Sequence, residues 1–138
     1  MKVISAGVII INHDNEVLLG HPTYHKWQNW NIPKGRVEDD ETLQEAALRE
    51  AFEETSLKYS YKDLGNHYHV PNYTKEKELH LYVINDSPSL NNVKCISYVG
   101  GDKSFPEFDK FAFVGKDKLE KYIQNIPLRN IILKILGE

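Results

Sequence analysis

The feature that most constrains the fold is an apolar run near the N-terminus. Residues 3–12, VISAGVIIIN, are rich in β-branched side chains, and the polar cluster HDNE separates them from a second apolar segment, VLLGH. β-branched runs that are bounded by turn residues are typical of strands. The sequence therefore predicts two strands joined by a short turn, the first of them deeply buried.

The rest of the chain mixes predicted strands with predicted helices. Further strands are predicted at LGNHYHV, LHLYVIN and KFAFVG, and a short extended piece at Trp30–Ile32, before Pro33. Helices are predicted from about Glu41 to Glu54, in KDKLEKYIQN and in PLRNIILKILGE, where Pro127 lies near the first turn. Residues 86–104 are compatible with either a strand or a long loop. This order predicts one α/β domain over residues 1–138, with helices packed on a sheet.

The predicted helix at 41–54, capped by Asp39 or Asp40, ends in a cluster of acids. Glu50, Glu53 and Glu54 fall at positions i, i+3 and i+4, where like charges repel, and they lie near the negative end of the helix dipole. Two interpretations are open. The cluster is either a solvated acidic stripe or a sheltered site for a divalent cation, and apolar residues on the same face favour the second. Oxygen ligands alone would select Mg²⁺ or Mn²⁺.

Composition excludes several classes of partner. The net charge of -3 gives no basic footprint for duplex DNA or for an anionic membrane. Cys95 is the only cysteine, so an intrachain disulfide and a cysteine metal cluster are both excluded. No apolar run approaches the roughly 20 residues of a membrane span. We therefore expect a cytoplasmic protein, monomeric or homodimeric, and this charge leaves a small or single-stranded phosphorylated ligand possible.

The residues around the acids form a longer pattern. They reproduce the spacing Gly-x5-Glu-x7-Arg-Glu-U-x-Glu-Glu-x-Gly-U, where U is aliphatic, at Gly35, Glu41, Arg49, Glu50, Glu53, Glu54 and Leu57. This pattern resembles the Nudix hydrolase box. The chain departs from it at Ala51, which is smaller than the usual aliphatic residue, and at Ser56, which replaces the second glycine. A left-handed residue is expected there to end the helix, at a cost of ~1 kcal/mol for serine.

The resemblance extends beyond the box. AGVIII followed by VLLG is similar to the family's first hairpin, and WNIPKG resembles the segment that leads into its box. Residues 106–114, PEFDKFAFV, are similar to a stretch of RNA 5′-pyrophosphohydrolases and of the related dinucleoside polyphosphate hydrolases. In those relatives a glutamate of this stretch approaches the metals, and Glu107 matches it. The resemblance implies the Nudix α/β/α sandwich around a mixed sheet.

The same resemblance implies a set of metal ligands and catalytic groups. Glu50 and Glu54 are the first ligands, with Glu53 binding directly or through water and the Gly35 carbonyl as a further ligand. Glu107 is expected to be an extra ligand or the general base, the alternative being a solvated loop acid. The cofactor would be Mg²⁺, or else Mn²⁺.

Two residues of the box are expected to support these groups. Arg49 would orient Glu53 or its neighbours, unless it forms only a surface ion pair. Glu41 would support the loop and the start of the helix.

Candidate substrate contacts are basic and aromatic. Lys26, Lys34 and Arg36 are candidates for phosphate, and Tyr82 is a candidate for stacking on a base. Other aromatic candidates are Tyr24, Trp27, Trp30, Tyr68 and Tyr73.

Family enzymes hydrolyse a nucleoside diphosphate linked to another group. The first candidate substrate is a dinucleoside polyphosphate such as diadenosine tetraphosphate. RNA 5′ ends, ADP-ribose and nucleoside-diphosphate sugars are alternatives. A nucleotide-binding sensor without catalysis is the alternative of a different class.

Overall fold

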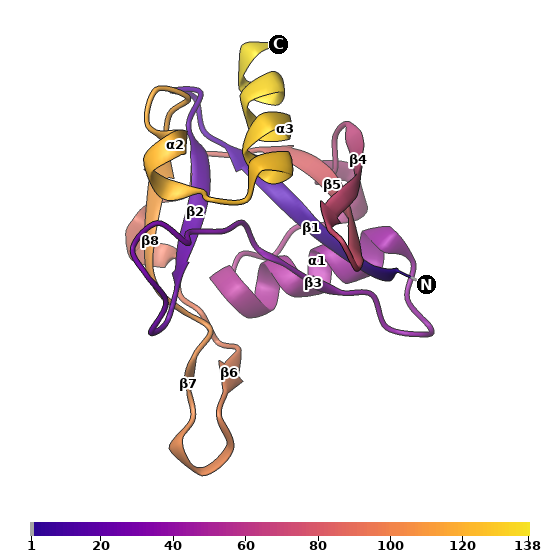
Figure 1. The fold of residues 1–138 in the computed structure, drawn as a ribbon, viewed down its shortest axis with the longest axis vertical. Helices are drawn as coiled ribbons and strands as arrows, with labels where there is room; N and C mark the ends of the chain where they lie inside the picture. Colours follow the sequence, from indigo (N-terminus) through magenta and orange to yellow (C-terminus); the bar gives the residue numbers. More distant parts are fainter. Residues whose placement is uncertain (1) are drawn as a thin grey trace.

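The computed structural model describes residues 2–138, which are built around a mixed β-sheet (Figure 1). In the described chain the sheet has the order β4-β5-β1-β2-β8, and β3 pairs with β1 off this path. The strands are β1 (Val3–Ile11), β2 (Val17–Pro22), β3 (Lys34–Arg36), β4 (His67–Thr74), β5 (Lys77–Asn85) and β8 (Phe108–Val114). β1 runs parallel to β5, and the other pairs are antiparallel. The predicted first two strands and their short turn are confirmed, with Ile11 opposite Val17.

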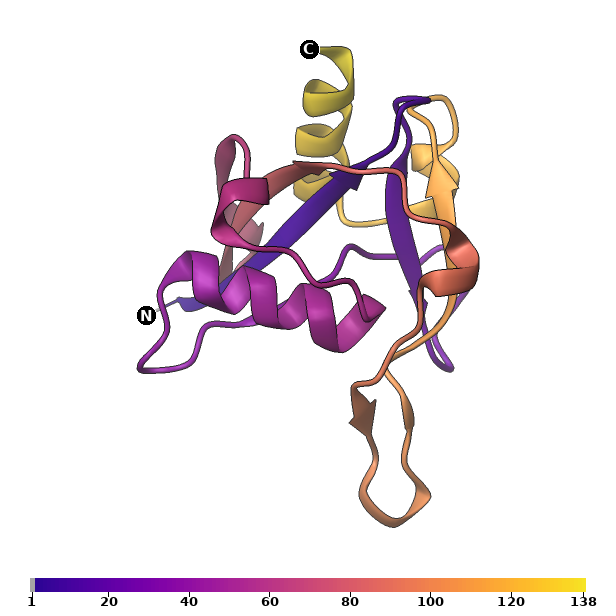
Figure 2. The same ribbon diagram turned by 180° about the vertical axis from the view of Figure 1, so that it is seen from behind.

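Helices cover both faces of the sheet (Figures 1 and 2). They are α1 (Leu43–Thr55), α2 (Leu119–Tyr122) and α3 (Ile126–Gly137). Side chains alternate along β1, so Val8 and Ile10 pack in the core under α1, whereas Ile9 and Ile11 pack in the core under α2 and α3. The predicted α/β/α sandwich around a mixed sheet is confirmed.

The start of α1 differs from the prediction. Neither Asp39 nor Asp40 caps the helix. Thr42 does so, because its hydroxyl accepts a hydrogen bond from the Glu45 N–H while the Glu45 carboxylate accepts one from the Thr42 N–H. This reciprocal capping box is encoded in the TLQE sequence, and it moves the first helical residue to Leu43.

Two further segments differ in extent from the predictions. Only Leu119–Tyr122 of the predicted helix KDKLEKYIQN is helical, because the Tyr122 carbonyl accepts a hydrogen bond from Trp30 and Ile123 bridges Asn29. β4 runs on to Thr74, beyond Val70, where the predicted strand LGNHYHV ends.

Residues 86–104, left open between strand and loop, are mainly loop. They hold 3-10 turns at Leu90–Asn92 and Gly101–Lys103 and the strand β6 (Tyr98–Val99). β6 pairs with β7 (Phe105–Pro106) in a hairpin that extends away from the body (Figure 1). Within residues 2–138, every helix is too short or too polar to span a bilayer.

Candidate active site

The acids of α1 differ in how far they are buried. Glu50 and Glu54 are only 8% and 4% exposed, because they lie on the side of the helix that faces β3 and the sheet. The Glu53 side chain is 40% exposed. Two carboxylates of the cluster are therefore withdrawn from water, which is incompatible with a wholly solvated stripe and which calls for a compensating positive charge.

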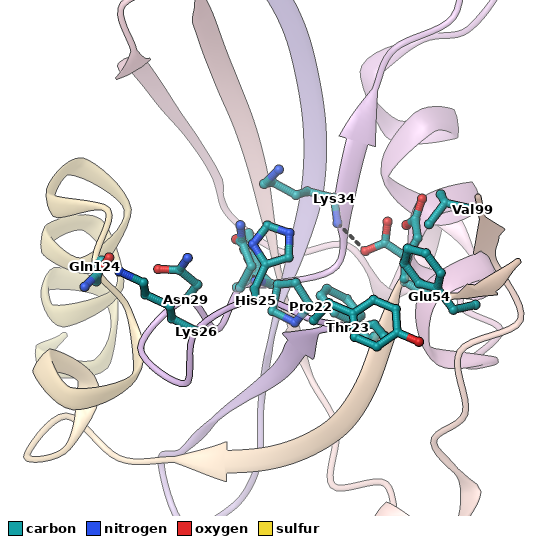
Figure 3. A pocket seen from close by; sticks show the side chains of 15 residues that line it. Pro22, Thr23, His25, Lys26, Asn29, Lys34, Glu54, Val99 and Gln124 are labelled. Carbon is teal, nitrogen blue, oxygen red and sulfur yellow. Dashed lines mark hydrogen bonds between the residues drawn. The ribbon is translucent and has the colours of Figure 1, made fainter. Parts of the chain in front are cut away.

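The short strand β3 borders these carboxylates. Gly35 pairs with Ala6 of β1, and its Cα lies against the Glu50 carboxyl group, so an added Cβ would overlap that group. The neighbouring Lys34 N–H donates a hydrogen bond of 3.1 Å to Glu54 Oε1 (Figure 3). The absence of a side chain at Gly35 is therefore what allows the Glu50 carboxylate to approach the β3 backbone.

Arg49 connects the acids of the box. Its Nε and Nη2 donate to the two oxygens of Glu41 at 2.6 and 2.9 Å, and Nη2 also donates to the Arg36 carbonyl at 3.0 Å. Its Nη1 donates to Glu50 Oε2 and to Glu53 Oε1, both at 3.2 Å. The Arg49 hydrogen bond holds the pKa of Glu41 below its usual range. One guanidinium thus fixes three carboxylates relative to one another.

The structure brings Glu107 to the acids of the helix, although it is distant in sequence. Glu107 and Glu54 line the same cavity, and contact with the Glu107 carboxyl group raises the pKa of Glu54. Burial, this contact and the charge of Glu50 hold the pKa of Glu54 well above its usual range. Burial also raises the pKa of Glu50, against the opposing influence of Arg49. Without a cation, the Glu54 carboxyl group therefore retains its proton at neutral pH.

Backbone hydrogen bonds hold Glu107 in this position. The Lys94 and Ile96 N–H groups donate to the carbonyls of Thr55 and Glu53 at the end of α1, both at 2.9 Å. Farther along the chain, the Glu107 N–H donates to the Ser97 carbonyl at 2.9 Å. The segment after β5 therefore satisfies the last carbonyls of α1 and delivers Glu107 to the helix.

Ser56 ends α1 in the left-handed conformation that the box pattern predicts. Its φ and ψ are 68° and 6°, and its N–H donates to the Phe52 carbonyl. The side-chain hydroxyl donates to the Lys94 carbonyl, which ties the strained residue to the connection described above. The missing glycine is thus accommodated locally, and the helix ends where the pattern requires.

A cavity of about 780 Å³ opens beside Glu54 and Glu107. Lys26 and Lys34, both predicted to contact substrate, line it. Figure 3 shows Lys26, with Asn29 and Gln124, toward one end and Glu54 toward the other. Lys34 Nζ also lies 5.2 Å from the centre of the Tyr73 ring. Positive and negative groups thus share one cavity of a size typical for small ligands.

Two predicted substrate contacts lie elsewhere. Tyr82 is 7% exposed in the core under α1, where its ring lies 5.0 Å from that of His67. Arg36 lines a separate shallow hollow with Val37 and Glu38. Neither Tyr82 nor Arg36 lines the cavity beside Glu54 and Glu107.

The sequence analysis missed several residues of the cavity wall. Five of them lie outside the named helices and strands and two lie in the β6–β7 hairpin: Thr23, His25, Asn29, Asn31 and Gln124, then Val99 and Phe105. Tyr24, named only as one of several aromatic candidates, also lies there, and its ring contacts Phe105 edge to face at 4.8 Å. The signal that could have indicated this loop is its composition, PTYHK, which combines a turn residue with aromatic and basic side chains.

The residues present suit a hard divalent cation. Glu50, Glu54 and Glu107 supply carboxylate oxygens at one place, and the Gly35 backbone lies against Glu50. The raised pKa values show that the positive charge of Arg49 does not compensate the buried acids. Oxygen donors with a deficit of positive charge match the requirements of Mg²⁺ or Mn²⁺.

Comparisons with known proteins assign the chain to a family. The model of the family described as NUDIX domain matches residues 1–133. The chain is 31% identical over 143 residues to a protein of Enterobacteria phage T4 described as "Uncharacterized 17.7 kDa protein in e-segB intergenic region", covering 96% of this chain and 94% of that one. It is 29% identical over 133 residues to the RNA pyrophosphohydrolase of Rickettsia prowazekii strain Madrid E, covering 89% and 80%.

Solved structures show the same fold. A C. elegans Ap4A hydrolase, in a binary complex, superposes with a TM-score of 0.74 at 20% identity, covering 98% of this chain and 96% of that one. A bifunctional NMN adenylyltransferase/ADP ribose pyrophosphatase from Francisella tularensis superposes with a TM-score of 0.72 at 17% identity, covering 99% of this chain and 42% of that one.

Proposed function

Since the chain belongs to the NUDIX domain family, we propose that it hydrolyses dinucleoside polyphosphates such as diadenosine tetraphosphate in a metal-dependent reaction. The coarser activity follows from the family: the chain is a pyrophosphohydrolase that acts on phosphorus-containing anhydrides. The observation that carries the proposal is the convergence of Glu50, Glu54 and Glu107 at one side of a cavity whose wall also holds Lys26 and Lys34.

Glu50, Glu54, Glu107 and the Gly35 carbonyl would hold Mg²⁺ or Mn²⁺, with Glu53 contributing directly or through water. When bound, the cation would supply Lewis acidity and would offset the negative charge of the pyrophosphate oxygens. Arg49 would act as a positioning residue, because its hydrogen bonds to Glu50 and Glu53 restrict where these carboxylates can lie.

The remaining groups would bind the substrate and move a proton. The Glu107 or Glu53 carboxylate would accept the proton of the attacking water, since either group could lie within reach of a phosphorus atom held at the carboxylates. The ammonium groups of Lys26 and Lys34 would bind the phosphate oxygens that extend along the cavity. A long polyphosphate suits this arrangement, because its charge is spread over several phosphates.

An aromatic pair would bind a base. Tyr24 is 83% exposed and contacts Phe105 at the cavity wall. Exposed rings of this kind offer a stacking surface worth about 1–3 kcal/mol per base. Tyr24 therefore replaces Tyr82 as the first candidate for base stacking.

RNA 5′ ends are the second candidate substrate. The observation in their favour is the likeness over most of the chain to a protein named RNA pyrophosphohydrolase. A triphosphorylated 5′ end presents a similar row of phosphates and a base, so the same lysines and aromatic pair would serve.

A substrate panel tests the proposal. We would measure kcat/KM with Mg²⁺ for diadenosine tetraphosphate, triphosphorylated RNA, ADP-ribose and ATP, using Glu54→Gln as the matched inactive control. We expect the dinucleotide to be preferred by at least tenfold, and turnover to stop on exhaustive chelation. Higher kcat/KM for RNA would select the second candidate. Tight nucleotide binding without hydrolysis of any anhydride would instead identify a sensor.

A further inference from the structure

A cluster of imidazoles lies at the edge of the sheet away from the cavity. β4 and β5 form that edge, whereas β2 and β8 form the other edge, beside the cavity loops (Figure 1). In the antiparallel β4–β5 pair, His69 lies opposite His80. Because side chains alternate along a strand, His67 and Glu78 project from the same face as this pair. The pairing therefore collects three histidines and a glutamate from two short sequences, HYH and ELH.

The atoms of this cluster lie at distances suited to a shared ion. Glu78 Oε1 is 3.2 Å from His69 Nε2 and 3.2 Å from His80 Nε2. All three atoms lie within 4.8 Å of one another. Ligand atoms at about 2.0–2.1 Å from a tetrahedral zinc ion are roughly 3.3–3.4 Å apart, so the two measured separations are close to those of a zinc site.

The fourth side chain, His67, would orient one ligand. Its Nε2 lies 2.8 Å from His80 Nδ1. When His80 donates its Nδ1–H to His67, the lone pair of His80 is on Nε2, toward Glu78 and His69. Metal-binding histidines in proteins are commonly fixed in this way by a partner on the other ring nitrogen.

One local rearrangement is required. The rings of His69 and His80 are stacked, with centroids 4.4 Å apart and planes at 8°, so a shared ion would not lie in both ring planes. The His69 side chain is 44% exposed and lies on the edge strand, so its ring is free to turn toward the ion. The His80 side chain, at 14% exposure, would stay in place.

We infer that His69, Glu78 and His80 form a binding site for a borderline transition-metal ion, Zn²⁺ first among them, distinct from the carboxylate site for Mg²⁺. Two imidazole nitrogens and one carboxylate oxygen favour Zn²⁺, Co²⁺, Ni²⁺ or Cu²⁺ over Mg²⁺, which prefers oxygen ligands. Three protein ligands leave a position for water. A bound ion would link the edge strand β4, through His69, to β5, through Glu78 and His80.

Zn²⁺ titration in the presence of millimolar Mg²⁺ tests the site, with the carboxylate site removed by Glu50→Gln and Glu54→Gln. We expect one Zn²⁺ per chain, with Kd below about 10 µM. His69→Ala and Glu78→Gln should each raise Kd by about 100-fold, and His67→Ala by about tenfold. Glu76→Gln, an exposed acid of the same hairpin, is the matched control and should leave Kd unchanged.

Co²⁺ provides a second, spectroscopic readout. We expect a visible absorption band that follows the same stoichiometry and that disappears in His69→Ala. His69 is largely exposed on an edge strand, so this variant should fold, as circular dichroism of the metal-free protein would check. Two results would overturn the assignment. One is weak binding of equal strength in His69→Ala, Glu78→Gln and Glu76→Gln. The other is a single Zn²⁺ that is lost when Glu50 and Glu54 are replaced but still binds in His69→Ala.

Discussion

Replacing Arg49 with lysine is the sharpest test of the box as a physical unit. The substitution keeps the positive charge but removes the planar group whose nitrogens donate to Glu41, Glu50, Glu53 and the Arg36 carbonyl. A lysine ammonium reaches less far and cannot bind both oxygens of Glu41 in parallel. A single ammonium group also cannot reach Glu41, Glu50 and Glu53 together, which the guanidinium does through separate nitrogens.

The magnitude follows from the contacts that are lost. A hydrogen bond to a charged group contributes about 1.5–3 kcal/mol. Two such bonds to Glu41 are lost, and lysine recovers roughly one of them. The Arg49 side chain is 26% exposed, so solvent weakens these bonds in part. We therefore expect Arg49→Lys to lower the free energy of unfolding of the metal-free protein by about 1.5–3 kcal/mol. The Mg²⁺ concentration for half-maximal rate should also rise, because Glu50 and Glu53 are less well positioned.

Urea denaturation with EDTA, followed by tryptophan fluorescence, measures the first effect. Arg36→Lys is the matched control. Arg36 bonds to Arg49 only through its backbone carbonyl, which the substitution keeps. This variant should therefore change the unfolding free energy by less than about 0.5 kcal/mol. Coincident unfolding curves for the two variants would refute the reasoning. They would mean that the observed hydrogen bonds contribute no more than their hydrated equivalents in the unfolded chain.

Three further outcomes are expected. The pKa of Glu54 is raised above its unfolded value, so the stability that it contributes to the metal-free protein is complete below about pH 4.5 and falls above it, by up to about 1.4 kcal/mol per pH unit. Urea curves from pH 5 to 8 should show this slope in wild type and a flatter one in Glu54→Gln; equal slopes would contradict it. For Glu107→Gln the measurement is an Mg²⁺ titration of the rate. If Glu107 is the base, kcat should fall at unchanged Mg²⁺ dependence, and if it is a ligand, the half-maximal Mg²⁺ concentration should rise. A titration that matches wild type would make Glu107 an ordinary loop acid. Gly35→Ala should displace the Glu50 carboxyl group and raise the Kd for Mg²⁺ by about tenfold, as isothermal titration would measure. Gly137→Ala, where an added Cβ meets open space, is the control.

The parts of the site that the sequence could predict are those held by local periodicity. Glu50 and Glu54 are one helical turn apart, so any helix at this position places them together whatever surrounds it. The left-handed Ser56 is local in the same sense, since many helices end in a residue of this conformation. Glu107 is different. Its N–H donates to the Ser97 carbonyl and its carbonyl accepts from the Thr23 N–H, and these backbone hydrogen bonds place it beside Glu54. No pattern within the box contains that information, and only the wider resemblance indicated it.

Aromatic contacts show where sequence reasoning could have gone further and where it could not. Leu79, Leu81 and Val83 alternate along β5 toward the core under α3, so the same alternation puts Tyr82 under α1. The printed sequence LHLYVIN was sufficient to predict that burial. Tyr24 had no such signal. It has a φ of 68° in an irregular loop, and the neighbouring Thr23 N–H bonds to the Glu107 carbonyl. The backbone contact that positions Glu107 at the acids thus also positions Tyr24 beside the cavity. In the function that we propose, the group that binds the base and the group that binds the metal or accepts the proton would therefore share one support.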